Sequence, residues 1–93
     1  MGYIEFTRDA NASYFIKAKN IEFINVTDNA SVKVYGNFTN DDLAMDEIDI
    51  TTTAGKAKAI ATLISEHIQQ GDNRVITIGH NDADISAVVL TAK

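Results

Sequence analysis

Apolar residues recur at three- and four-residue spacing between Thr53 and Gln70, the one stretch of the sequence with a clean helical period. This spacing puts an apolar stripe along one side of about five helical turns. The stripe consists of Ala57, Ile60, Ala61, Ile64, His67 and Ile68. Thr52 or Thr53 is the expected N-cap, and Gly71 suits the left-handed position that ends a helix. The pattern predicts a helix over residues 53–70 that lies on a sheet.

Elsewhere apolar and polar residues alternate with a period of two, which is typical of half-buried strands. The expected strands are Tyr3–Thr7, Tyr14–Lys19, Ile21–Thr27, Val32–Phe38, Glu47–Thr52, Arg74–Ile78 and Ile85–Thr91. No linker or low-complexity tract divides the chain. Residues 1–93 are therefore expected to form a single α+β domain, mainly β, with one helix inserted before the last two strands.

The last expected strand differs from the others because both of its faces are apolar. Ile85, Ala87 and Val89 lie on one face, and Val88 and Leu90 lie on the other. The second face needs either the helix or a neighbouring subunit to cover it. An oligomer and a strand placed beneath the helix are both open.

Composition limits how the fold is stabilised. A chain of 93 residues buries only about 60 to 65% of the surface that its unfolded form exposes. The sequence has no cysteine, so neither a disulfide nor a thiolate metal site supplements this thin core. Packing or association with other copies must supply the stability, and we expect a homo-oligomer.

Charge and hydropathy bear on partners and location. The net charge of −5 argues against a surface that attracts phosphate everywhere, although a local basic patch is compatible with it. No segment approaches membrane-spanning length, and residues 1–5 show neither a basic start nor an apolar run. A soluble intracellular protein without a membrane partner is expected.

A Gly-Lys pair at the start of the expected helix resembles a phosphate-binding loop, but the spacing fails. Ile50 stands where the first glycine belongs, and Ala57 replaces the required Ser or Thr. What remains is a positive spot, Lys56 and Lys58, at the helix end where the dipole favours anions. These lysines form a candidate anion site, and the alternative is that both are simply solvated.

The acidic and histidine residues give no catalytic constellation. Five carboxylates fall within nine residues but lack the order of a calcium loop, and a solvated loop explains them as well as a bound cation; they are Asp41, Asp42, Asp46, Glu47 and Asp49. His80 alternates with Asp82 and Asp84 in a polar turn, and His67 falls on the apolar side of the helix. No serine has a recognisable base. We expect a non-enzymatic protein without a cofactor or metal.

Three lysines are interleaved with aromatic residues on two of the expected strands, Tyr14–Lys19 and Val32–Phe38, which we expect to be neighbours. Lys17, Lys19 and Lys33 accompany Phe15 and Tyr35. Cations and aromatic rings on one sheet face bind single-stranded nucleic acid by charge and stacking. The same pattern is common on the outer face of any antiparallel sheet, so the solvated alternative stays open.

Two short segments resemble the motifs of the Sm-like family. Gly36, Phe38, Asp42 and Met45 match the spacing of the first Sm motif, with Asp46 where that motif has asparagine. Residues 75–81 resemble the second motif, with Ile78 where that motif has arginine. The whole chain is similar to small acidic Sm-like proteins of marine phages, of the cyanophage type in particular.

This resemblance implies a strongly bent antiparallel sheet or barrel of about five strands, with subunits joined edge to edge in a ring. It implies that RNA or single-stranded DNA binds at the motif loops. Met45 and its neighbour Asp46 would contact a base, Asp42 would orient the loop, and Gly79, His80 and Asn81 would form the opposing loop. The changes at Ile78 and Asp46 remove a stacking cation and a base-reading amide.

Two functional hypotheses follow. The first is a phage-derived Sm-like protein that forms a ring and binds RNA or single-stranded DNA, in the cytoplasm of an infected bacterium. The second is a structural or accessory protein of the virion that uses the same domain for assembly alone.

Overall fold

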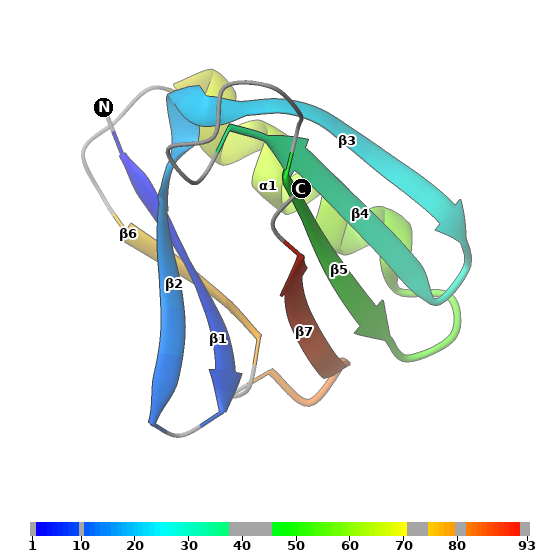
Figure 1. The fold of residues 1–93 in the computed structure, drawn as a ribbon. Coiled ribbons are helices and arrows are strands. Elements are labelled where there is room, and N and C mark those ends of the chain that lie inside the picture. The colour runs from blue at the N-terminus through cyan, green and yellow to red at the C-terminus, as the bar shows by residue number, and fades with distance from the viewer. Residues whose placement is uncertain (1, 10, 38–45, 71–74, 80–81, 92–93) are drawn as a thin grey trace.

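The computed structural model describes residues 2–9, 11–37, 46–70, 75–79 and 82–91. These residues form β-strands, one α-helix and one turn of 3₁₀-helix, η1, as Figure 1 shows. In chain order the elements are β1 (Tyr3–Asp9), β2 (Ala12–Lys17), η1 (Ala18–Asn20), β3 (Ile21–Asp28), β4 (Ser31–Gly36), β5 (Asp46–Thr52), α1 (Ala57–Gln70), β6 (Val75–Gly79) and β7 (Ile85–Thr91). The expectation of a mainly β fold with one helix before the last two strands is confirmed.

The strands form two sheets, which we call sheet A (order β2-β1-β6) and sheet B (order β3-β4-β5-β7). Neither sheet closes into a barrel. The expectation of one bent sheet or barrel of about five strands is therefore wrong, because the strands are divided between two open sheets. The reason is local: η1 follows β2 directly and leads the chain from sheet A into sheet B, so β2 and β3 do not form one continuous bent strand.

Sheet A is mixed and not purely antiparallel. β1 pairs with β2 in antiparallel fashion but with β6 in parallel, in a register that joins Tyr3 to Val75 and Thr7 to Gly79. A parallel pair needs a long crossover between its strands. Here β2, three strands of sheet B (β3, β4 and β5) and α1 lie within that crossover, so sheet A is completed by a strand from near the C-terminal end of the sequence.

The core lies between α1 and the inner face of sheet B and extends to sheet A. Figure 1 shows α1 behind β3, β4 and β5, with β7 beside β1. The buried residues come from strands of both sheets and from the apolar stripe of α1: Ile4, Phe6, Ile16, Val32, Val34, Ile48, Ile50, Ala57, Ile60, Ile64, Ile78, Ile85 and Val88. The helical period therefore located the side of α1 that packs on the sheet.

The helix begins at Ala57, four residues later than its period predicts, and ends as expected at Gln70. Gly55 has φ +88°, a conformation that favours glycine, and it sits in a turn before the helix. The amides of Gly55 and Ala57 both donate to the carbonyl oxygen of Asn29, at 2.8 and 3.4 Å. This tertiary contact holds residues 53–56 outside the helix.

Several strand ends also differ from the expectation. The second strand is Ala12–Lys17 because Ala18 and Lys19 belong to η1. Gly79, expected in a loop, is the last residue of β6, and the expected end of the fourth strand at Phe38 lies outside the described residues.

The two faces of β7 differ in burial. Ile85 was expected on the face of Ala87 and Val89, and this is wrong: the register of β5 with β7 shifts between Thr51 and Thr52, so Ile85 is buried as Val88 is. Ala87 and Val89 are exposed on the outer face of sheet B. Of the two alternatives left open by the sequence, the inner face is covered within the subunit, and the outer face is not.

Candidate functional site

The residues expected to bind nucleic acid at the two motif loops fall mostly outside the described part of the chain. Asp42, Met45, His80 and Asn81 are in this group. Gly79 lies in β6, where it approaches the backbone of Thr7.

Asp46 does not present its carboxylate to a ligand. It opens β5 opposite Gly36, shares the inward face of Ile48 and Ile50, and is fully buried. The alternation of β5 starts one residue earlier than the sequence suggested, which turns Asp46 inward. A buried Asp46 cannot contact a nucleic-acid base at the surface of the protein.

The three lysines expected on neighbouring strands do not lie on one sheet. Lys17 ends β2 in sheet A and Lys19 follows in η1, and both are exposed. Lys33 lies in β4, in the middle of sheet B. The expected arrangement is therefore wrong, because η1 separates β2 from the sheet that contains β4.

The outer face of sheet B carries a pair of stacked aromatic rings. Phe23 of β3 is paired with Tyr35 of β4, and their ring centroids are 5.7 Å apart with an interplanar angle of 25°. The next position along each strand on this face holds Asn25 and Lys33. Phe23 is 54% exposed, so one ring of the stack is open to a ligand or another protein surface.

Carboxylates oppose the single lysine on this face. The Nζ atom of Lys33 lies 3.5 Å from Oε2 of Glu47, and Asp49 is its register partner on β5. The pair is partly buried, with side-chain exposures of 31% and 16%, so it is screened less than a surface pair. With one cation against two carboxylates, this part of the face is not attractive to phosphate.

Each sheet has two edges with no pairing partner among the described strands, β2 and β6 in sheet A and β3 and β7 in sheet B. β2 forms one edge of sheet A, and β3 forms one edge of sheet B. Residues 12–20 carry Lys17 and Lys19 and no carboxylate, whereas residues 21–28 carry Glu22 and Asp28 and no cation. Phe15 on β2 is 57% exposed, close to the value for Phe23 on β3. The two edges therefore differ in charge and share an exposed phenylalanine.

The start of α1 is a weaker candidate than the sequence suggested. Lys56 and Lys58 are both exposed, and Lys58 lines a cleft of about 280 Å³ with Val26, Asp28, Asn29 and Gly55. Two backbone amides at this end already donate to Asn29. The carboxylate of Asp28 also lines the cleft and opposes an anion there.

The described histidine has a structural environment. His67 is buried on α1, and its Nε2 atom lies 3.2 Å from the carbonyl oxygen of Tyr3, which joins the helix to β1. Within the described ranges, no group of three or more His, Asp or Glu residues could hold a metal ion. No described helix is long and apolar enough to cross a membrane.

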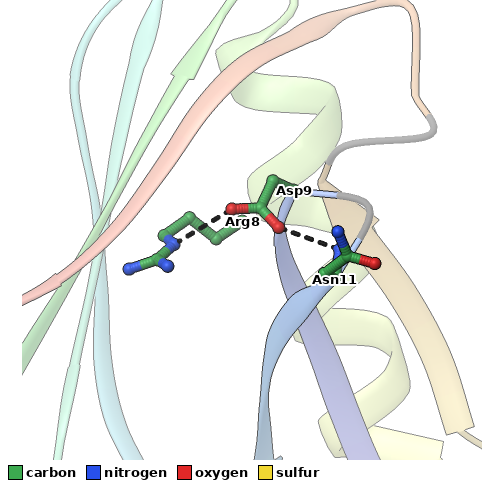
Figure 2. Close-up of polar contacts among 3 residues, drawn as sticks. All are labelled: Arg8, Asp9 and Asn11. Atoms are coloured by element: carbon green, nitrogen blue, oxygen red, sulfur yellow. Dashed lines mark hydrogen bonds and ion pairs between the residues drawn. The ribbon is translucent and has the colours of Figure 1, made fainter.

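A polar cluster stabilises the turn between β1 and β2 (Figure 2). Oδ1 of Asp9 accepts a hydrogen bond of 2.9 Å from the amide of Asn11, and Oδ2 lies 3.5 Å from Nε of Arg8. The Asn11 amide, together with Arg8, lowers the pKa of Asp9 below its ordinary value of 3.8. Asp9 therefore holds the turn through the Asn11 amide, whereas its ion pair with Arg8 is exposed to solvent.

Comparisons with known proteins found no match. A scan of family models, a search of curated proteins and a search of solved structures each gave none.

Sequence patterns missed the features that stand out in the structure. Phe23 was assigned to a strand but not to a surface, because its partner Tyr35 depends on the register of β3 with β4. The short turn between these strands, Asn29 and Ala30, was the signal that could have given that register. Thr7 and Arg8 carry no motif, and only the meeting of β1 with β7 makes them neighbours of a cleft.

Proposed function

We propose that this protein is a non-enzymatic assembly protein whose copies join edge to edge, the β2 edge of one copy pairing with the β3 edge of the next. The observation that carries the proposal is the pair of free strand edges with opposite charge. An exposed edge is a template for another strand, and opposite charges on two edges favour their pairing over the pairing of two identical edges.

Side chains support the same pairing. If the exposed faces of the two sheets are aligned in the assembly, Phe15 of one copy lies near Phe23 of the next and extends the Phe23–Tyr35 stack. Aromatic cross-strand pairs stabilise a sheet by about 0.2–1 kcal/mol beyond what alanines provide. The lysines of residues 12–20 would then oppose the carboxylates of residues 21–28, whereas β3 against β3 would bring Glu22 and Asp28 toward their own copies.

Pairing of two different edges is heterologous, so it closes into a ring or extends as a filament. A ring is the assembly implied by the resemblance to Sm-like proteins of marine phages. A phage origin and a place in the infected cell or in the virion belong to this proposal. Assembly alone is sufficient for the virion function, and co-purification with phage particles would favour it.

The test uses two variants, each of which damages one edge. Phe15→Glu damages the β2 edge, Phe23→Glu damages the β3 edge, and native mass reports the assembly. Each variant alone should be monomeric, because every copy then has the same damaged edge and the β2–β3 pair needs both edges intact. An equimolar mixture should give a dimer, since each variant retains the edge that the other lacks.

The control is Leu63→Glu, which places the same charge at an exposed position on α1. It should keep the native mass of the unmodified protein. A monomeric unmodified protein at high concentration would refute the proposal. Continued self-assembly of either edge variant would instead show that the interface joins two identical edges or another surface.

A second candidate function is weak binding of RNA or single-stranded DNA on the outer face of sheet B, and the exposed stack of Phe23 on Tyr35 favours it. Stacking of one base on an aromatic ring contributes about 1–3 kcal/mol, or about 5- to 150-fold in affinity. Tyr35→Ala should therefore weaken binding of a fluorescent poly-U oligonucleotide by at least about fivefold. Tyr35 lies inside the sheet, so this variant leaves the edges intact.

The salt dependence separates stacking from charge. Because Glu47 and Asp49 surround Lys33, we expect a shallow decrease in affinity with salt, with a slope of about one phosphate contact. Leu63→Ala is the matched control and should bind as the unmodified protein does. Absence of binding at low salt would eliminate this second function and leave the assembly proposal untouched.

A further inference from the structure

A cleft, which we call the β3–α1 groove, lies along the edge of β3 on the side of sheet B that faces α1. It has a volume of about 310 Å³ and is lined by Ile21, Glu22, Phe23, Ile24, Ser65 and Ile68. The three isoleucines pack against the border of the core and are only partly buried. In Figure 1 β3 forms the outer border of sheet B, and no described strand pairs with it on that side. The groove is therefore apolar and adjoins an open strand edge.

The β2 edge has an aromatic residue that matches this groove. Tyr14 is the register partner of Phe6, which is fully buried, so Tyr14 lies on the inner face of sheet A. The ring of Tyr14 packs against the core but is only partly buried. Ile16, the next residue on the inner face, is 6% exposed and is covered within its own subunit. Tyr14 is therefore the large inner-face side chain of β2 that a neighbouring copy can cover.

We propose that, within the edge-to-edge assembly on which this inference rests, the β3–α1 groove receives Tyr14 of the next copy and β2 pairs with β3 in antiparallel orientation. If Phe15 lies opposite Phe23 of the next copy, Tyr14 lies on the α1 side, because side chains alternate between the faces of a strand. In the antiparallel orientation Tyr14 is opposite Ile24, on the apolar floor of the groove. The hydroxyl of Ser65 in the groove offers a partner to the phenol group, which needs one once it is covered.

The charges along the two edges favour the same orientation. Antiparallel pairing puts Lys17 beside Glu22, a cation beside a carboxylate. Parallel pairing would put Tyr14 opposite Glu22 instead of opposite an isoleucine. It would also put Lys17 opposite Asn25, away from this carboxylate. Lys19 lies beyond the end of β2, in η1, so the register of neither pairing places it.

Engineered cysteines test the orientation, because the sequence has no cysteine of its own. Asn25→Cys is mixed with an equal amount of either Ser13→Cys or Lys17→Cys, and the mixture is oxidised. All three positions lie on the outer faces of the two sheets. With Phe15 opposite Phe23, Asn25 is opposite Ser13 only in antiparallel pairing and opposite Lys17 only in parallel pairing. Non-reducing electrophoresis should show a linked dimer with Ser13→Cys and none with Lys17→Cys, and each variant alone is the control.

A variant of α1 tests the groove without changing either strand edge. Ser65 is exposed, and Ser65→Phe fills the groove with a ring from the helix. This variant should raise the dissociation constant of self-association, measured by sedimentation, by at least about tenfold because Tyr14 loses its site. Ala59→Phe adds the same ring at an exposed position of α1 outside the groove and should change that constant by less than about twofold. Far-UV circular dichroism should show that both variants are folded.

The results distinguish the position of Tyr14 from the assembly on which it depends. A link to Lys17→Cys instead of Ser13→Cys, or unchanged association of Ser65→Phe, would overturn the antiparallel placement of Tyr14 and leave edge-to-edge assembly standing. No link to Asn25→Cys in either mixture would show that β2 and β3 do not pair. That result would overturn both proposals and leave the groove open to a segment of another protein.

Discussion

A methyl group added at Gly79 would lie 2.3 Å from the carbonyl oxygen of Thr7. The two residues are register partners in the parallel pair of β1 and β6, and Gly79 has φ +140°. Both the close approach and the backbone conformation require glycine at the end of β6. Glycine at this position therefore lets the end of β6 pair closely with β1.

Gly79→Ala should strongly destabilise the protein. The added Cβ meets backbone atoms of Thr7, which cannot rotate away, and the backbone conformation is also strained for alanine. We expect a loss of at least about 2 kcal/mol in the free energy of unfolding, measured by urea denaturation. Gly55→Ala is the control: Gly55 also has a positive φ, +88°, but a Cβ there meets nothing within 4 Å. Its loss should be about 1 kcal/mol, and equal losses would show that the contact with Thr7 is unimportant.

Ile64 and Leu63 are adjacent on α1 but face opposite environments. Ile64 is fully buried against the sheet, and Leu63 is 43% exposed. Ile64→Ala should lower the free energy of unfolding by about 2–5 kcal/mol because it leaves a cavity. Leu63→Ala should change it by less than about 1 kcal/mol. Thermal or urea unfolding compares the two, and similar values would contradict the packing of α1.

His67 joins the end of α1 to the first residue of β1. Its Nε2 atom, 3.2 Å from the carbonyl oxygen of Tyr3, must carry the hydrogen to donate this bond. His67→Leu keeps an apolar side chain but removes the donor, so the free energy of unfolding should fall by about 1–3 kcal/mol. Hydrogen exchange should show faster opening at Tyr3 in this variant. Unchanged exchange there would mean that the bond does not hold β1 to the helix.

Asp9 makes the turn between β1 and β2 sensitive to acid. Its pKa is lowered from the ordinary value of 3.8, mainly by the hydrogen bond from the Asn11 amide. A lowered pKa means that the stabilisation is complete above the ordinary value and is lost as the pH falls through the lowered pKa. The Asn11 amide shift should therefore titrate below 3.8. In Asp9→Asn this titration should disappear, and its persistence would assign the transition to another group.

The sequence predicted the ends of a helix or strand where neighbouring residues determine them, and missed the ends that depend on contacts distant in sequence. The end of α1 and both ends of β7 are as predicted, because apolar periodicity and the residues at their ends determine them. The start of α1 was missed because the Asn29 carbonyl, far away in sequence, binds the amides of Gly55 and Ala57. No local pattern contains that contact.

The candidate surfaces were less predictable for the same reason. Lys33 was expected beside Lys17, but sheet membership is decided by the three residues of η1. Asp46 was interpreted as part of a solvated acidic run, and its inward face follows from the register of β4 with β5. Composition can indicate which side chains are available, whereas pairing between strands decides which of them meet.

The parallel pairing of β1 with β6 has a consequence for the order of folding. The strands β3, β4 and β5 pair between segments close in sequence, while Tyr3 must pair with Val75 across most of the chain. Closing such a large loop is slow because the entropy is lost before the contacts form. We therefore expect β3, β4, β5 and α1 to form first. The β1–β2 hairpin is only marginally stable by itself. It becomes stable when β6 pairs with β1 and completes sheet A.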